Sequence, residues 1–201
     1  MSALRFLARK CALAAGLLLA VLVTGCAHPI SLSPDVASLA GSGKAKIDRK
    51  IGLSISDADR QREVTGPGGG GDKVNYFPYR DLETGLYIAL SESFSQVTRV
   101  SGPTDPKVKE QGLNYLATPI IVTTSSSPSM VTWPPTLFTI ALTCTISDVQ
   151  GNAITELRVF GEGRAEFDEF KADTSLSARR AASDVLKKLM TAIAEAAPKL
   201  R

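Results

Sequence analysis

The feature that most constrains the fold is a strict alternation of apolar and small polar side chains over residues 138–147. Phe138, Ile140, Leu142, Cys144 and Ile146 take every second position, with Thr, Ala and Ser between them. Because successive side chains of a β-strand point to opposite faces, this pattern predicts a strand with one apolar and one threonine-rich face. Such a strand is typical of an antiparallel sheet covered on one side only.

A second strand is expected directly after this one. The connecting residues 148–152 read DVQGN, and the Gly-Asn pair suits the positive φ of a hairpin turn. Beyond the turn, Leu157, Val159, Ala165 and Phe167 share one parity. Gly161 and Gly163 stand between them, which predicts either a bulge or the close approach of a helix.

Two segments carry apolar residues at helical spacing, and each has a single apolar stripe. The first begins near residue 80 and the second ends at Pro198. Their stripes are Leu82, Leu86, Ala89, Leu90, Phe94 and Val97, and then Leu176, Ala182, Val185, Leu186, Leu189, Met190 and Ile193.

Three further segments complete the expected architecture. Residues 47–55 alternate like a half-buried strand, residues 74–77 predict a short strand, and residues 115–124 form a β-rich run. Pro119 lies within that run and predicts an edge, a bulge or a break there. The sequence therefore predicts an α+β fold: a two-layer sandwich of a mainly antiparallel sheet of about four strands, with two amphipathic helices on one face.

The N-terminus reads as an export signal. Three cations at positions 5, 9 and 10 precede a 13-residue apolar stretch over residues 11–23. That stretch is shorter than the roughly 20 residues that span a bilayer, and it is followed by Thr24, Gly25 and Cys26. The arrangement resembles the lipobox of a bacterial lipoprotein signal. The resemblance implies cleavage between Gly25 and Cys26, and diacylglyceryl and N-acyl (palmitate-type) chains on Cys26.

This interpretation divides the chain into three parts. Residues 1–25 are expected to be the cleaved signal peptide, and residues 26–44 the lipidated N-terminus with a flexible tether rich in proline and small polar residues. Residues 45–201 are expected to form a single α+β periplasmic domain. Within that domain, residues 66–71 read GPGGGG and predict a mobile loop.

Composition excludes several classes of function. The 23 Lys+Arg and 20 Asp+Glu become 20 of each once the signal is removed, so no basic stripe predicts nucleic acid as a partner. Asp72 follows Gly71 where a phosphate-binding loop requires lysine, which argues against a nucleotide. His28, the only histidine, lies in the expected tether two residues after Cys26, so neither a Ser-His dyad nor a histidine-rich metal site is expected. No cofactor or metal is expected beyond covalent lipid on Cys26.

One loop combines apolar side chains with prolines. Met130, Val131 and Trp133 lie in the stretch 125–135, where an exposed apolar loop would contact a partner or a lipid surface. The alternative is that these side chains fold back over the sheet edge or the core.

Several short stretches together resemble YajG-like bacterial envelope lipoproteins. Across most of the mature chain, the similarity rests on the stretches Cys26-Ala27-His28-Pro29, Ser33-Pro34, Lys50-Ile51-Gly52-Leu53-Ser54-Ile55, Asp57-Ala58-Asp59-Arg60 and Arg80-Asp81-Leu82, and on the hairpin and helix after Thr136. The resemblance implies an envelope lipoprotein of poorly defined role. A broader similarity extends to auxiliary lipoproteins of lipid-moving transporters.

Three functions follow as hypotheses. The first is a membrane-anchored, non-catalytic binding or adaptor component of the cell envelope that contacts an envelope protein or lipid. The second is a lipid-handling auxiliary subunit of a transport system. The third, an envelope hydrolase, would depend on the acidic group Glu166, Asp168 and Glu169. Ala27 in place of Asp resembles the sorting pattern for the inner leaflet of the outer membrane, facing the periplasm.

Overall fold

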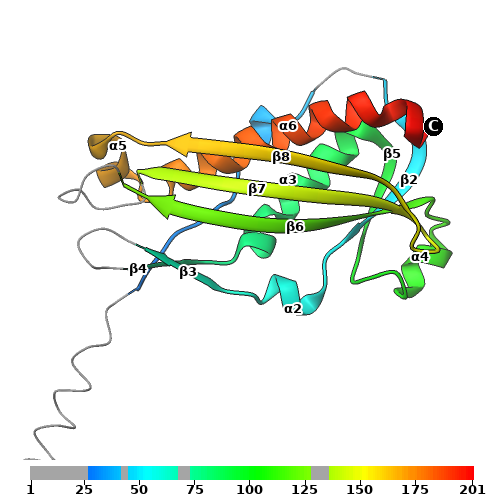
Figure 1. Ribbon diagram of the computed structural model, residues 1–201, viewed down its shortest axis with the longest axis horizontal. Coiled ribbons are helices and arrows are strands. Elements are labelled where there is room, and N and C mark those ends of the chain that lie inside the picture. Colours follow the sequence, from blue (N-terminus) through cyan, green and yellow to red (C-terminus); the bar gives the residue numbers. More distant parts are fainter. Residues whose placement is uncertain (1–26, 42–44, 68–72, 128–135) are drawn as a thin grey trace, which may run out of the picture.

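The computed structural model describes residues 27–41, 45–67, 73–127 and 136–201, which form a twisted sheet with long helices on one face (Figure 1). The main sheet has five strands in the order β5-β2-β6-β7-β8, beside a smaller sheet in the order β1-β4-β3. The main strands are β2 (Ile47–Ser54), β5 (Phe94–Val100), β6 (Tyr115–Ser126), β7 (Leu137–Asp148) and β8 (Ala153–Arg164).

The predicted α+β class is correct, but the expected count of about four strands is too low. β2 pairs in parallel with both β5 and β6, whereas β6, β7 and β8 pair antiparallel, so the main sheet is mixed. The additional strand is β5, whose Phe94 and Val97 continue the helical spacing of the preceding segment. Helix α3 (Pro78–Ser93) nevertheless ends before Phe94, which is extended and pairs with Ile47 of β2. Pairing with β2 therefore overrides the local periodicity.

The long helices α3 and α6 (Leu176–Leu200) lie together on one face of the main sheet, as predicted (Figure 1). Their apolar stripes meet the inward residues of β6 and β7, including Ile140 and Leu142, which are at most 1% exposed. Short helices lie at the margins: η1 (Val36–Ser38), α2 (Asp57–Arg60), α4 (Pro106–Glu110) and α5 (Phe167–Ala172).

The glycines of β8 allow α6 to pass directly over the strand. A Cβ built on Gly163 would lie 2.0 Å from the backbone oxygen of Ser177, and one on Gly161 would lie 2.5 Å from that of Ala181. No larger residue fits this spacing. Of the two alternatives that the sequence left open at these glycines, close approach of a helix is confirmed.

Pro119 lies within a continuous strand, since β6 pairs with β7 from Tyr115 to Ser126. The N–H of Ile121 donates to the hydroxyl of Tyr79 rather than to β7. Alternation then directs the nitrogen of Pro119 away from β7 as well, and pairing with β2 has already ended at Ala117. The missing N–H thus removes no hydrogen bond from the sheet, and Pro119 occupies a local edge.

The tether expected over residues 26–44 is wrong for residues 27–41. Strand β1 (Ala27–Pro29) pairs with β4 (Lys73–Tyr76), which in turn pairs with β3 (Val64–Pro67). Ile30, Leu32 and Leu39 are buried in the main core. Their apolar side chains stabilise the packed state more than solvation of the small polar residues around them stabilises a free coil. Residues 27–41 are therefore part of the folded domain.

The opposite face of the sheet is covered only at one end. There Val100, Val108, Leu113 and Leu116 form a separate small core beneath α4. Among the described residues, no helix lies over the remainder of that face, which is formed by β6, β7 and β8 (Figure 1).

Candidate functional site

The uncovered part of the sheet carries an exposed apolar row. Register places Val122, Ala141 and Phe160 side by side across β6, β7 and β8. Val122 is 60% exposed, Phe160 is 52% exposed, and Ile120 beside this row is 55% exposed. We call this surface the open face; its outward residues are Thr118, Ile120, Val122, Thr124 and Ser126 of β6, Leu137, Thr139, Ala141, Thr143 and Thr145 of β7, and Glu156, Arg158, Phe160, Glu162 and Arg164 of β8.

Charges of alternating sign flank Phe160 on the open face. Arg158 pairs with Glu156 at 2.6 Å, and Arg164 pairs with Glu162 at 2.7 Å. These pairs are solvent-exposed, so each contributes little to stability. Their positions instead give β8 a regular charge pattern: negative and positive at Glu156 and Arg158, apolar at Phe160, then negative and positive again at Glu162 and Arg164.

The outer edge of β8 is closed by side chains of α6. Lys188 Nζ donates to the backbone oxygen of Phe160 at 2.9 Å, and Asp184 accepts from the backbone N–H of Glu162 at 3.0 Å. Arg180 donates to the backbone oxygen of Arg164 at 2.7 Å. Side chains thus occupy backbone groups that an added strand would need, a common protection of sheet edges. A partner is therefore directed to the open face rather than to this edge.

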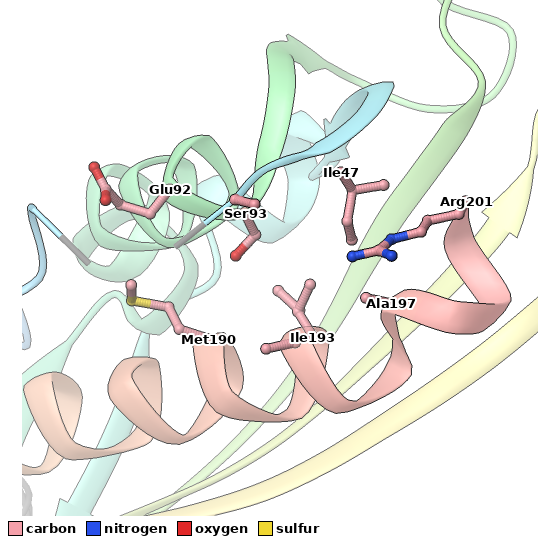
Figure 2. A pocket seen from close by; sticks show the side chains of 9 residues that line it. Ile47, Glu92, Ser93, Met190, Ile193, Ala197 and Arg201 are labelled. Atoms are coloured by element: carbon pink, nitrogen blue, oxygen red, sulfur yellow. The ribbon is translucent and has the colours of Figure 1, made fainter. Parts of the chain in front are cut away.

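A cavity of about 250 Å³ lies between α3, the start of β2 and the end of α6 (Figure 2). Met190, Ile193 and Ala197 line its α6 side, Ile47 and Ser93 lie opposite, and its other lining residues are Ala45, Glu92, Ala194 and Arg201. Its volume is below the roughly 300–1,000 Å³ of sites that enclose small molecules. The cavity, which has a mainly apolar lining, is therefore a gap between packed elements rather than a lipid-sized groove.

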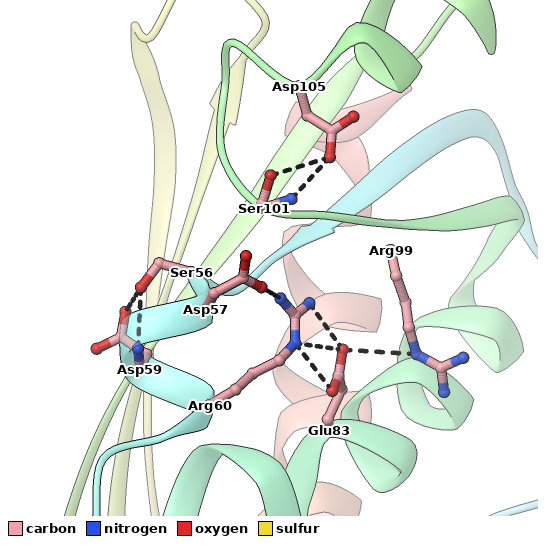
Figure 3. A network of polar contacts seen from close by, with 8 residues as sticks. All are labelled: Ser56, Asp57, Asp59, Arg60, Glu83, Arg99, Ser101 and Asp105. Atoms are coloured by element: carbon pink, nitrogen blue, oxygen red, sulfur yellow. Dashed lines mark hydrogen bonds and ion pairs between the residues drawn. The ribbon is translucent and has the colours of Figure 1, made fainter.

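A polar network links α2, α3 and β5 at the other end of the covered side (Figure 3). Arg60 contacts Asp57 at 2.9 Å and Glu83 at 3.0 Å, and Arg99 approaches Glu83 at 3.6 Å while lying over the ring of Tyr87. Hydrogen bonding to Glu83 raises the pKa of Arg60. These charges hold the elements together, since Asp57 and Glu83 each lie against an arginine.

The acidic group proposed for hydrolysis has a structural role. Glu166 and Glu169 form a capping box at the start of α5, and Asp168 pairs with Lys171 at 3.1 Å. Hydrogen bonds from Arg180, and from the backbone of Glu166, lower the pKa of Glu169 to about 2. A general acid needs a raised pKa, so this site holds its carboxylate in the wrong state for that chemistry.

Cys144 lies on the covered face of β7, where burial raises the pKa of its thiol to about 12. A nucleophilic cysteine needs the opposite shift. Within the described ranges, three or more His, Cys, Asp or Glu side chains nowhere gather as a metal site would require. In that same part of the chain, every helix is too short or too polar to span a bilayer.

The site residues predicted from sequence, Gly25, Cys26, Met130, Val131 and Trp133, all lie outside the described residues. The open face was not predicted as a site. Its signal was nevertheless present, because Phe160 shares the parity of Arg158 and Glu162 rather than that of Leu157. An aromatic residue on the polar parity of a half-buried strand marks an exposed apolar position.

No protein-family model and no curated protein sequence matches the chain. Among solved structures, a Xanthomonas campestris protein of family DUF330 has a TM-score of 0.50 at 11% identity, covering 88% of this chain and 96% of that protein. A minor lipoprotein from Acinetobacter baumannii has a TM-score of 0.47 at 15% identity, covering 73% of this chain and 93% of that protein. The first likeness shows a shared α+β fold.

Proposed function

We propose that this protein is a lipid-anchored envelope lipoprotein that acts as a non-catalytic binding or adaptor component. The observation that carries the proposal is the open face, where Ile120, Val122 and Phe160 are each more than half exposed. Exposed apolar patches of this kind mark interaction surfaces on soluble domains. The binding surface is then a rigid sheet, and the covered face stabilises it.

Anchoring is assigned to Cys26 at the end of the export signal. Each buried CH₂ of an acyl chain contributes about 0.8 kcal/mol, so several chains together hold a protein firmly in a bilayer. Strand β1 begins at Ala27, one residue after the proposed anchor, so the domain would lie directly at the membrane surface. We place the protein in the inner leaflet of the outer membrane, facing the periplasm, and assign it to the YajG-like lipoproteins on the sequence resemblance above. The lipoprotein character of the Acinetobacter protein is in line with this class.

A non-catalytic role accounts for the state of the reactive groups among the described residues. Cys144 is buried with a raised pKa, Glu169 is bound by Arg180, and Arg60 is bound by Glu83. The lipid-handling alternative receives less support, because the apolar cavity beside Met190 is small, and the larger hollow of about 670 Å³ beside Arg179 and Lys187 is lined mostly by polar and charged residues. The residues on which that alternative depends, Met130, Val131 and Trp133, lie outside the described part of the chain.

Site-specific photocrosslinking in intact cells tests this function. A photoreactive amino acid at Phe160 is expected to capture protein, whereas the same amino acid at Lys187, exposed on α6, serves as the matched control. Failure of Phe160 to capture any protein above the Lys187 control would contradict the adaptor role. In a second measurement, Cys26→Ala should release the protein from the membrane fraction, and continued sedimentation with membranes would contradict lipid anchorage.

A further inference from the structure

We propose that the open face binds a second copy of this chain, face to face, about a two-fold axis that runs along the row Val122, Ala141 and Phe160. The inference rests on the proposed function, because it names the partner of the same surface. It is carried by the order of the charges, by the closed edge of β8 and by the position of Ala27.

The charged residues of β8 are complementary to those of a second β8 strand that runs in the opposite direction. Reading outward from Phe160, Arg158 stands on one side and Glu162 on the other, followed by Glu156 and Arg164. Rotation about an axis through Phe160 reverses the strand, so Arg158 meets Glu162 of the second copy and Glu156 meets its Arg164. Four charges then face opposite charges, and the isologous contact needs a single self-complementary surface.

The same rotation leaves the other two strands compatible. Val122 and Ala141 meet their own counterparts on the axis, Ile120 meets Thr124, and Thr143 meets Thr139. Two sheet faces packed in this way lie about 10 Å apart, a spacing filled by the side chains of both copies. Phe160, the largest exposed side chain of the row, would be buried against its counterpart.

Other occupants fit these observations less well. An added strand would compete with Lys188, Asp184 and Arg180 for the backbone of β8. An anionic bilayer surface attracts Lys and Arg, whereas this strand presents Glu156 and Glu162 in equal number to its arginines. Balanced, alternating charge favours a protein surface with the reversed order, and the second copy supplies one.

The axis is compatible with two anchors in one membrane. Ser125 of β6 donates to the backbone oxygen of Pro67 at 2.9 Å, and the hydroxyls of Tyr76 and Thr123 lie 2.8 Å apart. The small sheet, with Ala27 on its β1 strand, therefore lies on the β6 side of the open face, away from β8 (Figure 1). Rotation about an axis that runs from β8 to β6 keeps both copies of Ala27 on that side.

The size of the surface predicts a weak dimer. The outward residues of β6, β7 and β8 form five rows across the three strands, and this surface measures about 27 Å by about 14 Å. The two copies together therefore bury about 800 Å². That area is below the roughly 1,200 Å² of stable complexes and is typical of transient ones. Anchoring in a membrane plane raises the effective concentration of two copies, which allows such a contact to form there.

Crosslinking of cysteine variants in native membranes tests the register. Ala141→Cys lies on the axis, so a bis-maleimide that reaches about 10 Å should join two copies. Thr118→Cys and Ser126→Cys each lie about 27 Å from their own counterpart and should not self-crosslink. Co-expression of these two variants should give a crosslinked pair, because position 118 then faces position 126. The unsubstituted chain controls for Cys26 and Cys144.

Charge reversal tests the identity of the occupant. Arg158→Glu or Glu162→Arg alone places like charges opposite each other and should reduce the Ala141→Cys crosslink at least threefold. Co-expression of the two reversed chains should restore it, because each reversed residue then meets an opposite charge. Recovery in the mixture is a signature that only a second copy can give.

The outcomes separate this inference from the adaptor function. If Ala141→Cys fails to join two copies while Phe160 captures another envelope protein, the second copy is excluded and the adaptor function stands. If neither position captures protein, both proposals fail. Self-crosslinking of Thr118→Cys at the efficiency of Ala141→Cys would overturn the axis.

Discussion

The two faces of the sheet formed by β6, β7 and β8 differ in how far their apolar side chains are buried. On the covered face, Ile140 and Leu142 are at most 1% exposed beneath α3 and α6, whereas on the open face Val122 and Phe160 are more than half exposed. On β6, for example, Ile121 is 8% exposed, whereas its neighbours Ile120 and Val122 are 55% and 60% exposed. Since buried apolar area stabilises folding and exposed apolar area does not, the covered face determines stability and the open face is available for recognition.

The two faces of the sheet are expected to differ most in the reactivity of a thiol placed on each of them. Burial raises the pKa of Cys144 to about 12, so at pH 8 its reactive thiolate is on the order of a thousandfold scarcer than that of an ordinary cysteine. A Thr143→Cys variant places a thiol on the open face, one residue away. Labelling with iodoacetamide, followed by mass spectrometry of each peptide, should modify position 143 at least a thousandfold faster than Cys144. Comparable rates would show that β7 does not separate the two environments.

Gly163 tests how closely α6 approaches the covered face. Gly163→Ala adds a Cβ that would lie 2.0 Å from the backbone oxygen of Ser177, so the helix must move. We expect the free energy of unfolding to fall by about 3 kcal/mol in urea titrations. Gly102→Ala is the matched control, because its Cβ meets no atom within 4 Å, and its effect should stay within about 0.5 kcal/mol. Equal effects of the two substitutions would contradict the close packing of α6 on β8.

One substitution can be made on both faces. Ile140→Val removes a buried methylene and should lower the free energy of unfolding by about 1 kcal/mol. Ile120→Val removes the same group from a side chain that is 55% exposed, and its effect should be within about 0.3 kcal/mol. Urea unfolding followed by circular dichroism measures both. A cost at Ile120 as large as that at Ile140 would mean that the open face is covered in the monomer.

The sequence predicts the covered face better than the open one. Alternation over residues 138–147 and the stripe of α6 identify buried positions because burial imposes a periodic pattern. The spacing of Phe94 and Val97 predicts a helix, and only pairing with β2 selects the strand. Ile30 and Leu32 fall within the predicted tether, because isolated apolar residues show no periodic pattern, and their burial depends on contacts with the rest of the core.

The open face could not be recognised from one strand at a time. Phe160, Ala141 and Val122 are far apart in the chain, and only the register of the sheet places them in one row. The reversed order of Arg158 and Glu162 about Phe160 likewise has meaning only once β8 is known to pair with β7 and to expose these side chains. The proposed anchor at Cys26 differs from the open face in this respect, because a short linear motif predicts it without any knowledge of the fold.

The smallest expected effect concerns the margin where α5 and α6 close the edge of β8. Arg180 binds both Glu169 and the backbone of Arg164. Its hydrogen bonds to Glu169, together with one from the backbone of Glu166, lower the pKa of Glu169 from 4.5 to about 2. A depressed pKa in the folded state contributes stability that is present above about pH 4.5 and is lost as the pH falls through about 2. In Glu169→Gln this contribution is absent. The melting temperature of the unsubstituted protein should therefore exceed that of the variant at pH 6, and the gap should narrow between pH 4.5 and pH 2. If the melting temperatures of the two proteins instead differ by the same amount at every pH in that range, Arg180 closes the edge without any help from Glu169, through its bond to Arg164 alone.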